Sequence, residues 1–360
     1  ARAIGMDPLE FRKKNVIPDT AYPTTGASGI KLEVLSHEAC LSKIEKLMDY
    51  PRLKAEIAQL REQGIYRGIG FATLIELTNP SAAFYGVGGA RIASQDGCTI
   101  RLDPSGAISV SVSVGEQGQG TEGIYAQIAA DALGVPVGTF TLIGPDTALT
   151  PDAGKTSASR QTFVSGRAAL AAASALRSTI LRLANAGPQA IIRVEAGQVV
   201  VHDDGLRRAI DLRAMPADRF GYAMSAEATY DPPTSPQDVN GQGNPYAIYG
   251  YGAQMVEAEV DIELGTVRLI KITAAHDLGC VINPTLAEGQ IEGGIAQGIG
   301  IAAEGDTVVL ATAVLAVVGH RQSFFVSHSR LFRPAMRQNP GRRPARARRA
   351  WCCRLASFRG

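Results

Sequence analysis

A glycine-rich stretch at residues 115–123, GEQGQGTEG, is the first part of the sequence with the residue types and spacing for ligand chemistry. Gly118, Gly120 and Gly123 fit G-x-G-x-x-G, which holds the pyrophosphate of a dinucleotide when it links a buried parallel strand to a helix. Glycines leave backbone N–H groups open, and a helix start favours negative charge. The stretch predicts a site for phosphate or another oxygen-rich group, with Gln119 as an added side-chain donor.

Two later segments carry similar donors before expected helices. The segment GKTSASR at residues 154–160 offers hydroxyls and a guanidinium, from Thr156, Ser157, Ser159 and Arg160. Taken alone, it is equally typical of a helix N-cap cluster. The segment EGQIEGG at residues 288–294 places Gln290 between glycines near the start of another helix. Together the segments favour one large ligand with many oxygen atoms.

The elements that must position the glycine stretch begin with a hairpin over residues 98–114. Its second arm alternates apolar residues with serines, which predicts one buried and one polar face. A nicotinamide site needs a strand that is apolar on both faces. The hairpin therefore argues against NAD. A turn without a ligand stays open as the simplest alternative.

The rest of the chain alternates hairpins with helices. Helices are expected over residues 36–50, 51–64, 121–134, 160–188 and 285–300, and strands over 66–77 and 138–146. Hairpin turns are expected near residues 196–197 and 263–266, and residues 1–35 read as irregular. This order predicts an α+β fold with mixed and antiparallel sheets packed with helices. It does not fit a doubly wound parallel sheet.

The composition is that of an ordinary globular protein, with 45% apolar and 19% charged residues. No stretch reaches the roughly 18 apolar residues of a membrane span. No signal peptide is visible, so we expect a cytoplasmic protein and leave the periplasm open. The five cysteines form no CxxC pair and read as buried single thiols. The five histidines show no metal-ligand spacing, so no metal ligand is assigned.

The composition changes abruptly near residue 302. Residues 301–360 hold eleven arginines and two acids, Glu304 and Asp306. This tail fits three interpretations: a basic arm that binds nucleic acid, a disordered extension, or translation out of frame. We favour the last, because no aromatic interleaving or RNA-binding motif accompanies the arginines. Nucleic acid is therefore not expected as a partner.

Several blocks, read in order, resemble the large molybdopterin-binding subunit of the xanthine oxidase family of molybdenum hydroxylases. They are DPLEFRKKN (7–15), GQGTEGIYAQIAADALG (118–134), DTALTPDAGKTSASRQTFVSG (146–166) and VINPTLAEGQIEGGIAQGIG (281–300). The resemblance runs to about residue 302 and is greatest to bacterial carbon monoxide, aldehyde, aromatic and purine dehydrogenases. It implies the end of a first molybdopterin-binding domain with linker helices at 1–65, a second such domain at 66–302, and an aberrant tail at 303–360.

The resemblance also implies a cofactor and its contacts. The cofactor would be molybdenum–molybdopterin in its cytosine dinucleotide form. The implied cofactor-binding residues are Gly118, Gln119, Gly120, Thr156, Ala158, Ser159, Arg160 and Gln290. An enzyme of this family hydroxylates an aldehyde, an N-heterocycle or a similar small substrate with oxygen from water. Its electrons pass to a small 2Fe-2S subunit and a medium FAD subunit, and the full-length assembly would be a dimer of heterotrimers.

The catalytic glutamate of the family lies in a G-x-K-G-x-G-E block that this sequence lacks. No catalytic residue is therefore assigned, and we expect this polypeptide alone to be inactive. Two alternatives come from other classes of protein. One is an NAD-dependent dehydrogenase that uses the G-x-G-x-x-G loop, and the other is a non-catalytic nucleic-acid binder that uses the basic tail.

Overall fold

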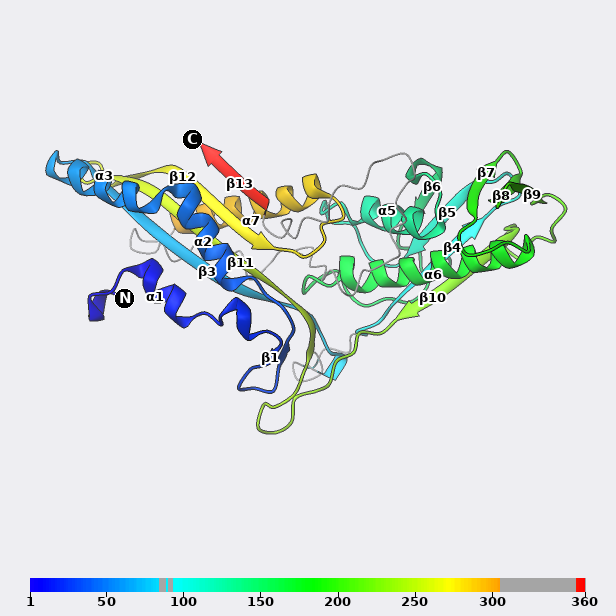
Figure 1. The fold of residues 1–360 in the computed structure, drawn as a ribbon, viewed down its shortest axis with the longest axis horizontal. Helices are drawn as coiled ribbons and strands as arrows, with labels where there is room; N and C mark the ends of the chain where they lie inside the picture. The colour runs from blue at the N-terminus through cyan, green and yellow to red at the C-terminus, as the bar shows by residue number, and fades with distance from the viewer. Residues whose placement is uncertain (84–88, 90–92, 305–353, 360) are drawn as a thin grey trace. The chain divides into compact units, whose positions relative to one another are not determined.

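The computed structural model describes residues 1–83, 89 and 93–304, together with the backbone of residues 354–359 (Figure 1). The described chain forms two compact units. Of the described residues, unit 1 combines 1–78 with 237–304 and 354–359, and unit 2 comprises 79–236. The strand that begins at Tyr66 belongs to the sheet of unit 1, and the expected boundary between domains at residue 65 stays a prediction.

Unit 1 is built on a four-stranded sheet in the order β13-β12-β11-β3. Its strands are β3 (Tyr66–Pro80), β11 (Tyr246–Asp261), β12 (Thr266–Asp277) and β13 (Arg354–Arg359). Strands β11 and β12 form the expected antiparallel hairpin. Side chains alternate between faces along a strand. Accordingly, Ala253 and Met255 lie in the cluster shared with helix α2 (His37–Met48), whereas Ala274 packs with helix α7 (Pro284–Glu304).

The first 35 residues contain more structure than the sequence analysis predicted. Helix α1 spans Pro8–Asn15, and Asp7 caps it by accepting hydrogen bonds from the backbone N–H groups of Leu9 and Glu10. An aspartate cap before a first-turn proline is a recognised helix start, so the expectation of irregular structure was wrong. The short elements here are η1 (Arg2–Ile4), η2 (Asp19–Ala21), β1 (Thr24–Thr25) and β2 (Lys31–Leu32), followed by α2 and α3 (Tyr50–Glu62).

Unit 2 is built on a second four-stranded sheet in the order β10-β4-β5-β6. Its strands are β4 (Asp96–Leu102), β5 (Ile108–Val112), β6 (Phe140–Ile143) and β10 (Met224–Tyr230). Strand β4 is antiparallel to β5 and β10, but β5 and β6 are parallel. Helices α5 (Thr121–Leu133) and α6 (Gln161–Leu183) pack against each other and the sheet. A smaller sheet holds β7 (Ile191–Glu195), β8 (Gln198–Asp203) and β9 (Leu206–Asp211), and η3 (Val137–Thr139) precedes β6.

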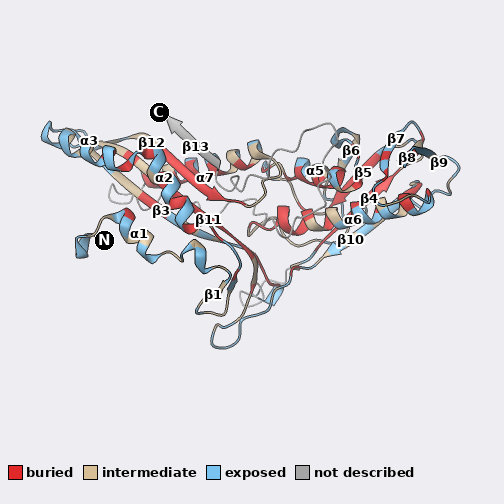
Figure 2. Cartoon of the chain, viewed as in Figure 1, coloured by how far each residue is buried: buried red, intermediate tan, exposed pale blue. Residues whose placement is uncertain are grey.

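Strand β5 corrects one expectation, because its serine face is buried as well. The side chains of Ser109 and Ser111 are 9% and 0% exposed, and Figure 2 shows buried residues along β4 and β5. Arg101 covers this face: its Nη1 donates to the Ser111 hydroxyl at 3.2 Å, and its guanidinium lies over the rings of Phe220 and Tyr222. Alternation of serine with apolar residues therefore did not mark a solvent-facing side.

The end of α6 differs slightly from the prediction. The helix ends at Leu183, where Asn185 adopts a left-handed φ of 48° and the Ala186 N–H donates to the Leu181 carbonyl. The helix therefore stops before the expected end at residue 188, because asparagine tolerates the left-handed conformation that ends a helix better than most residues do. The expected α+β fold of mixed sheets and helices is confirmed.

The structure also bears on the expectations for the cysteines, for membrane spans and for the Arg-rich tail. Cys40 and Cys98 are buried thiols, as expected, whereas Cys280 is only partly buried. Within the described residues, no helix has the length and apolar character required to cross a membrane. The Arg-rich tail lies outside the described residues, except that the backbone of Arg354–Arg359 pairs with β12.

Candidate cofactor-binding site

The glycine stretch forms the loop between the end of β5 and the start of α5. Gly118 and Gly120 adopt φ values of 93° and 78°, and Gly120 is the N-cap of α5. Such left-handed φ values strongly favour glycine. Gly118 is exposed, and a Cβ added there would meet no atom within 4 Å. A ligand can therefore approach the backbone of the loop closely at this point.

Glu116 occupies the N–H groups that the sequence analysis assigned to a ligand. Its Oε1 accepts hydrogen bonds from the N–H groups of Gly118 and Gly120, both at 2.9 Å. Its Oε2 accepts from the Thr121 hydroxyl at 3.1 Å and from the Glu122 N–H at 3.2 Å. Partial burial acts to raise the pKa of Glu116, but these hydrogen bonds outweigh it and hold the pKa below its usual value.

This contact shows that the start of α5 binds a carboxylate. The donors of Gly118 and Gly120 are engaged within the protein, so a ligand must either displace Glu116 or bind through other groups of the loop. Sequence reasoning missed Glu116. An acid two residues before the first left-handed glycine of a helix-opening loop is the signal that could have found it.

Gln119 points into unit 2 and is only 7% exposed. Its Nε2 donates to the Gln161 Oε1 at 2.8 Å, to the Thr121 hydroxyl at 3.1 Å and, more weakly, to the Gly115 carbonyl at 3.3 Å. Its Oε1 accepts from the Gln117 N–H at 2.5 Å. The amide therefore organises the loop from beneath.

The segment before α6 lies beside the glycine loop, as the sequence analysis expected. The Thr156 hydroxyl donates to the Gly115 carbonyl at 3.0 Å, and the Gln161 Nε2 donates to the same hydroxyl at 2.6 Å. Gln161 thus contacts both segments. The structure brings together two of the predicted segments and adds Gln161, which the sequence analysis did not single out.

Ala158 and Ser159 adopt a strained turn, with φ values of 59° and 52°. Two consecutive non-glycine residues with left-handed φ are uncommon, and each costs roughly 1–2 kcal/mol. The Asn79 N–H donates to the Ala158 carbonyl at 3.0 Å, which helps to hold the turn. Strain of this kind is concentrated at functional sites.

Arg160 is fully buried and all of its donors are engaged by this chain. Its Nε donates to the Asn79 Oδ1 at 3.1 Å, and its Nη1 forms an ion pair with Asp96 at 2.9 Å. The remaining bonds run to three backbone carbonyls, those of Lys155, Ser94 and Gln95. The guanidinium thus anchors the turn from below.

Asp96, the partner of Arg160, is also fully buried. Burial acts to raise the pKa of its carboxyl group, while Arg160, the Ser165 hydroxyl and the Gly154 N–H act to lower it. The same carboxylate therefore connects β4 with the segment before α6 and with the first turns of α6. Asp96 has no local sequence signal for this role, because its side-chain partners lie more than 50 residues away.

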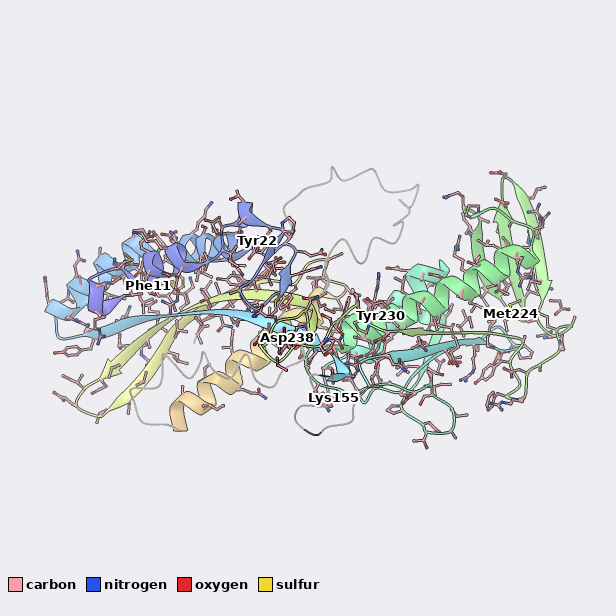
Figure 3. All side chains as sticks on the ribbon, turned by 90° about the horizontal axis from the view of Figure 1, so that it is seen from below. Phe11, Tyr22, Lys155, Met224, Tyr230 and Asp238 are labelled. Atoms are coloured by element: carbon pink, nitrogen blue, oxygen red, sulfur yellow. The ribbon has the colours of Figure 1, made fainter. Side chains whose placement is uncertain are left out.

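Lys155, labelled in Figure 3, adds a positive charge three residues before the Ala158–Ser159 turn. Burial and the nearby positive charge of Arg160 lower the pKa of its ammonium group. The first turns of α6 also pack on β10: Phe163 and the Arg167 guanidinium both contact the ring of Tyr230. The segment before α6 therefore combines a positive charge with a firmly seated helix start.

Gln290 lies on α7 and is partly buried. It belongs to unit 1, whereas every other predicted site residue belongs to unit 2. Its assignment to the cofactor stays a prediction.

The local topology around the glycine loop matches that of a dinucleotide site in part. The loop follows a strand buried on both faces and opens α5, and β6 then pairs in parallel with β5. Asp146 follows the end of β6, where an acidic residue would meet a ribose in a dinucleotide fold. Strand β5 nevertheless carries the buried polar residues Ser109 and Ser111 on one face and is the second arm of an antiparallel hairpin, so the sequence argument against NAD is not overturned. The other strand pairs of this sheet are antiparallel, whereas a doubly wound fold is built on a mostly parallel sheet.

No group of three or more histidine, cysteine, aspartate or glutamate side chains with the geometry of a metal site occurs in the described part of the chain.

Comparison with known proteins defines the class. The family model of the molybdopterin cofactor-binding domain matches residues 43–316, and the chain belongs to this family. It is similar to the nicotine 6-hydroxylase large subunit of Paenarthrobacter nicotinovorans, with 27% identity over 84% of this chain and 37% of that protein. It is also similar to the carbon monoxide dehydrogenase large chain of Hydrogenophaga pseudoflava, with 28% identity over 84% of this chain and 38% of that protein.

A solved structure of Cu,Mo-CO dehydrogenase shares the fold, with a TM-score of 0.68 and 23% identity over 84% of this chain and 38% of that chain. The present chain spans less than two fifths of the length of these relatives. The resemblance to the large subunits of molybdenum hydroxylases is thus confirmed for part of such a subunit.

Proposed function

We propose that this chain forms part of the molybdopterin-binding site of a molybdenum hydroxylase. The observation that carries the proposal is the direct junction of two segments, 115–121 and 156–161, at the starts of α5 and α6. The site belongs to a chain of the molybdopterin cofactor-binding domain family. Each segment offers backbone or hydroxyl donors beside a helix start, which suits a ligand with several oxygen atoms and phosphate groups.

The residues present fit such a ligand. The start of α5 already binds the Glu116 carboxylate, so its N–H groups have the geometry to hold an oxyanion. Gly118 leaves open space above the loop. Lys155 supplies positive charge beside the strained Ala158–Ser159 turn. Gly118, Gly120, Thr156 and Ser159 would contact the cofactor, while Gln119 and Arg160 would position those contacts.

When bound, the molybdenum centre supplies two-electron redox chemistry that adds oxygen from water to the substrate. This chain's residues would orient the cofactor through the loop that follows β5 and the segment before α6. We assign no proton-transfer role to any described residue. The substrate class in the proposal is an aldehyde, an N-heterocycle or a similar small molecule, and the name of the nicotine 6-hydroxylase relative supports an N-heterocycle.

The proposal extends to the assembly and to the form of the cofactor. Relatives named as a large subunit and a large chain support partner subunits for electron transfer, which we propose carry 2Fe-2S and FAD. The complete enzyme would be a cytoplasmic dimer of heterotrimers. The cofactor would be the cytosine dinucleotide form, whose extra phosphate and nucleoside would add contacts to the site.

The test is the cofactor content of the chain produced in a host that makes molybdopterin cytosine dinucleotide. We expect molybdenum and cytidine monophosphate to co-purify with the wild-type protein. Gly120→Val should lower both, because valine strains the left-handed N-cap of α5. Gly138→Val is the matched control, since its backbone is not left-handed and its surroundings are open. A folded wild-type chain without molybdenum or pterin would contradict the proposal.

The parallel strand–loop–helix–strand unit keeps NAD as a second candidate ligand. An NAD site would give saturable NADH fluorescence enhancement, and Gly120→Val would abolish it. Molybdopterin binding predicts no enhancement with NADH at concentrations that saturate ordinary dehydrogenases. The match to the molybdopterin cofactor-binding domain family favours the second outcome.

A further inference from the structure

Gln161, the first residue of α6, lies between the two candidate cofactor-binding segments. Its Oε1 accepts from the Gln119 Nε2 at 2.8 Å, and its Nε2 donates to the Thr156 hydroxyl at 2.6 Å. Thr156 in turn donates to the Gly115 carbonyl at 3.0 Å. One amide thus joins the glycine loop to the segment before α6.

This chain of hydrogen bonds has one possible direction. It begins at the Gly115 carbonyl, which can only accept, so the Thr156 hydroxyl donates to it and accepts from an N–H of Gln161. The Gln161 carbonyl oxygen must therefore face Gln119. At the other end, the Gln117 N–H can only donate, so the Gln119 Oε1 faces it. Both amide orientations are set by backbone groups of fixed polarity.

Burial makes each of these bonds costly to lose. Gln161 is 1% exposed and Gln119 is 7% exposed, so water has little access to replace a missing partner. A buried donor left without an acceptor keeps its full desolvation cost. The Gln119 Nε2 has two other acceptors, Thr121 and Gly115, but the bond to Gln161 is the shortest of the three.

We propose that Gln161 is a positioning residue for cofactor binding: it holds the 156–160 segment in register with the glycine loop and fixes the amide of Gln119. The proposal rests on the proposed function, because it takes these segments as the cofactor site. Gln161 itself is buried and is not expected to contact the cofactor.

The test compares four variants of the full chain. Gln161→Met removes the amide at nearly constant volume. Gln161→Glu keeps an acceptor for Gln119 but, when ionised, has no donor for Thr156. Thr156→Val removes the hydroxyl and Thr156→Ser keeps it. Gln127→Met is the matched control, a partly buried glutamine on α5 outside this chain of bonds.

The first readout is amide hydrogen exchange at Gln117, measured by NMR. Loss of one such bond predicts exchange roughly two- to tenfold faster in Gln161→Met, and wild-type exchange in Gln161→Glu and Gln127→Met. The global unfolding midpoint is measured alongside, so that a general loss of stability is recognised. Gln117 exchange that is unchanged in Gln161→Met, or equally fast in the Met and Glu variants, would overturn the proposed role in fixing Gln119.

The second readout is molybdenum bound per folded chain. Supporting residues behind metal sites typically contribute ten- to hundredfold in affinity, so we expect about a tenfold weaker retention in Gln161→Met and Thr156→Val. Thr156→Ser should recover most of it. Equal retention in all variants would overturn the role in cofactor binding. A wild-type chain that binds no molybdenum would instead refute the proposed function, while the exchange result still decides whether Gln161 fixes Gln119.

Discussion

The starts of α5 and α6 present the same kind of feature built in two different ways. Both helices follow residues with left-handed φ, but α5 uses Gly118 and Gly120 whereas α6 uses Ala158 and Ser159. The α5 loop is tied by Glu116, within six residues of every group it binds. The α6 turn is tied by Arg160 to Asn79 and Asp96, far away in sequence.

The two segments are held in their conformations by different kinds of contact. The α5 loop is relaxed and partly exposed, so local hydrogen bonds suffice. The α6 turn is strained, so it depends on a buried ion pair and on contacts from β4 and residue 79. We therefore expect the α6 turn to be rigid and costly to disrupt, and the α5 loop to respond to pH and to ligands.

The largest expected effect is on the buried ion pair. Arg160→Met leaves the Asp96 carboxylate buried without its cation, which typically destabilises a protein by about 3–5 kcal/mol. Urea unfolding measures it. Arg207→Met, which removes an exposed partner of Glu195, is the control and should cost less than about 1 kcal/mol. A similar small loss for Arg160→Met would show that the α6 turn does not depend on this pair.

The next effect concerns backbone strain. The change in the free energy of unfolding should have opposite signs in the two segments. Gly118→Ala places a side chain at φ 93° and should cost about 1–2 kcal/mol, although there is open space for the methyl group. Ala158→Gly relieves a left-handed alanine and should leave stability unchanged or raise it by about 0.5 kcal/mol. Thermal unfolding of both variants measures this. Destabilisation by Ala158→Gly as large as by Gly118→Ala would remove the contrast.

The smallest effect concerns pH. Glu116 has a lowered pKa in the folded chain, so its contribution is complete above the ordinary value of 4.5 and is lost as pH falls through the folded value. Glu116→Gln should therefore cost about 1 kcal/mol at pH 7, and this difference from wild type should shrink in acid. Urea titrations at several pH values measure it. Glu122→Gln, one charge changed in the same first helical turn, is the control. A pH-independent difference would refute the role of the charge.

The same contrast explains how much was predictable from sequence. Periodicity and turn residues gave the existence of α5, α6, α7 and the hairpins, because those signals are local. The glycine loop was found for the same reason. The serine face of β5 was misjudged, since Arg101, Phe220 and Tyr222 cover it from other parts of the chain. Contacts between residues this far apart along the chain leave no pattern in the neighbouring sequence.

The candidate site shows the same limit. Thr156 and Gln119 were expected near one ligand, and the structure brings their segments together. Gln161 and Asp96 were missed because each acts by hydrogen bonding to other segments, and those partners cannot be read from the sequence. Arg160 was expected to face the cofactor, and the structure instead engages all its donors beneath the turn. A residue type predicts what a side chain can donate, whereas its partners depend on the fold.

The most direct test of the account is a crystal structure of the chain loaded with molybdopterin. We expect polar contacts from the cofactor to the loop at Gly118–Gly120 and to the segment at Thr156–Ser159, with Arg160 still paired to Asp96. Cofactor bound away from both segments, or Arg160 released from Asp96 to bind it, would contradict the account.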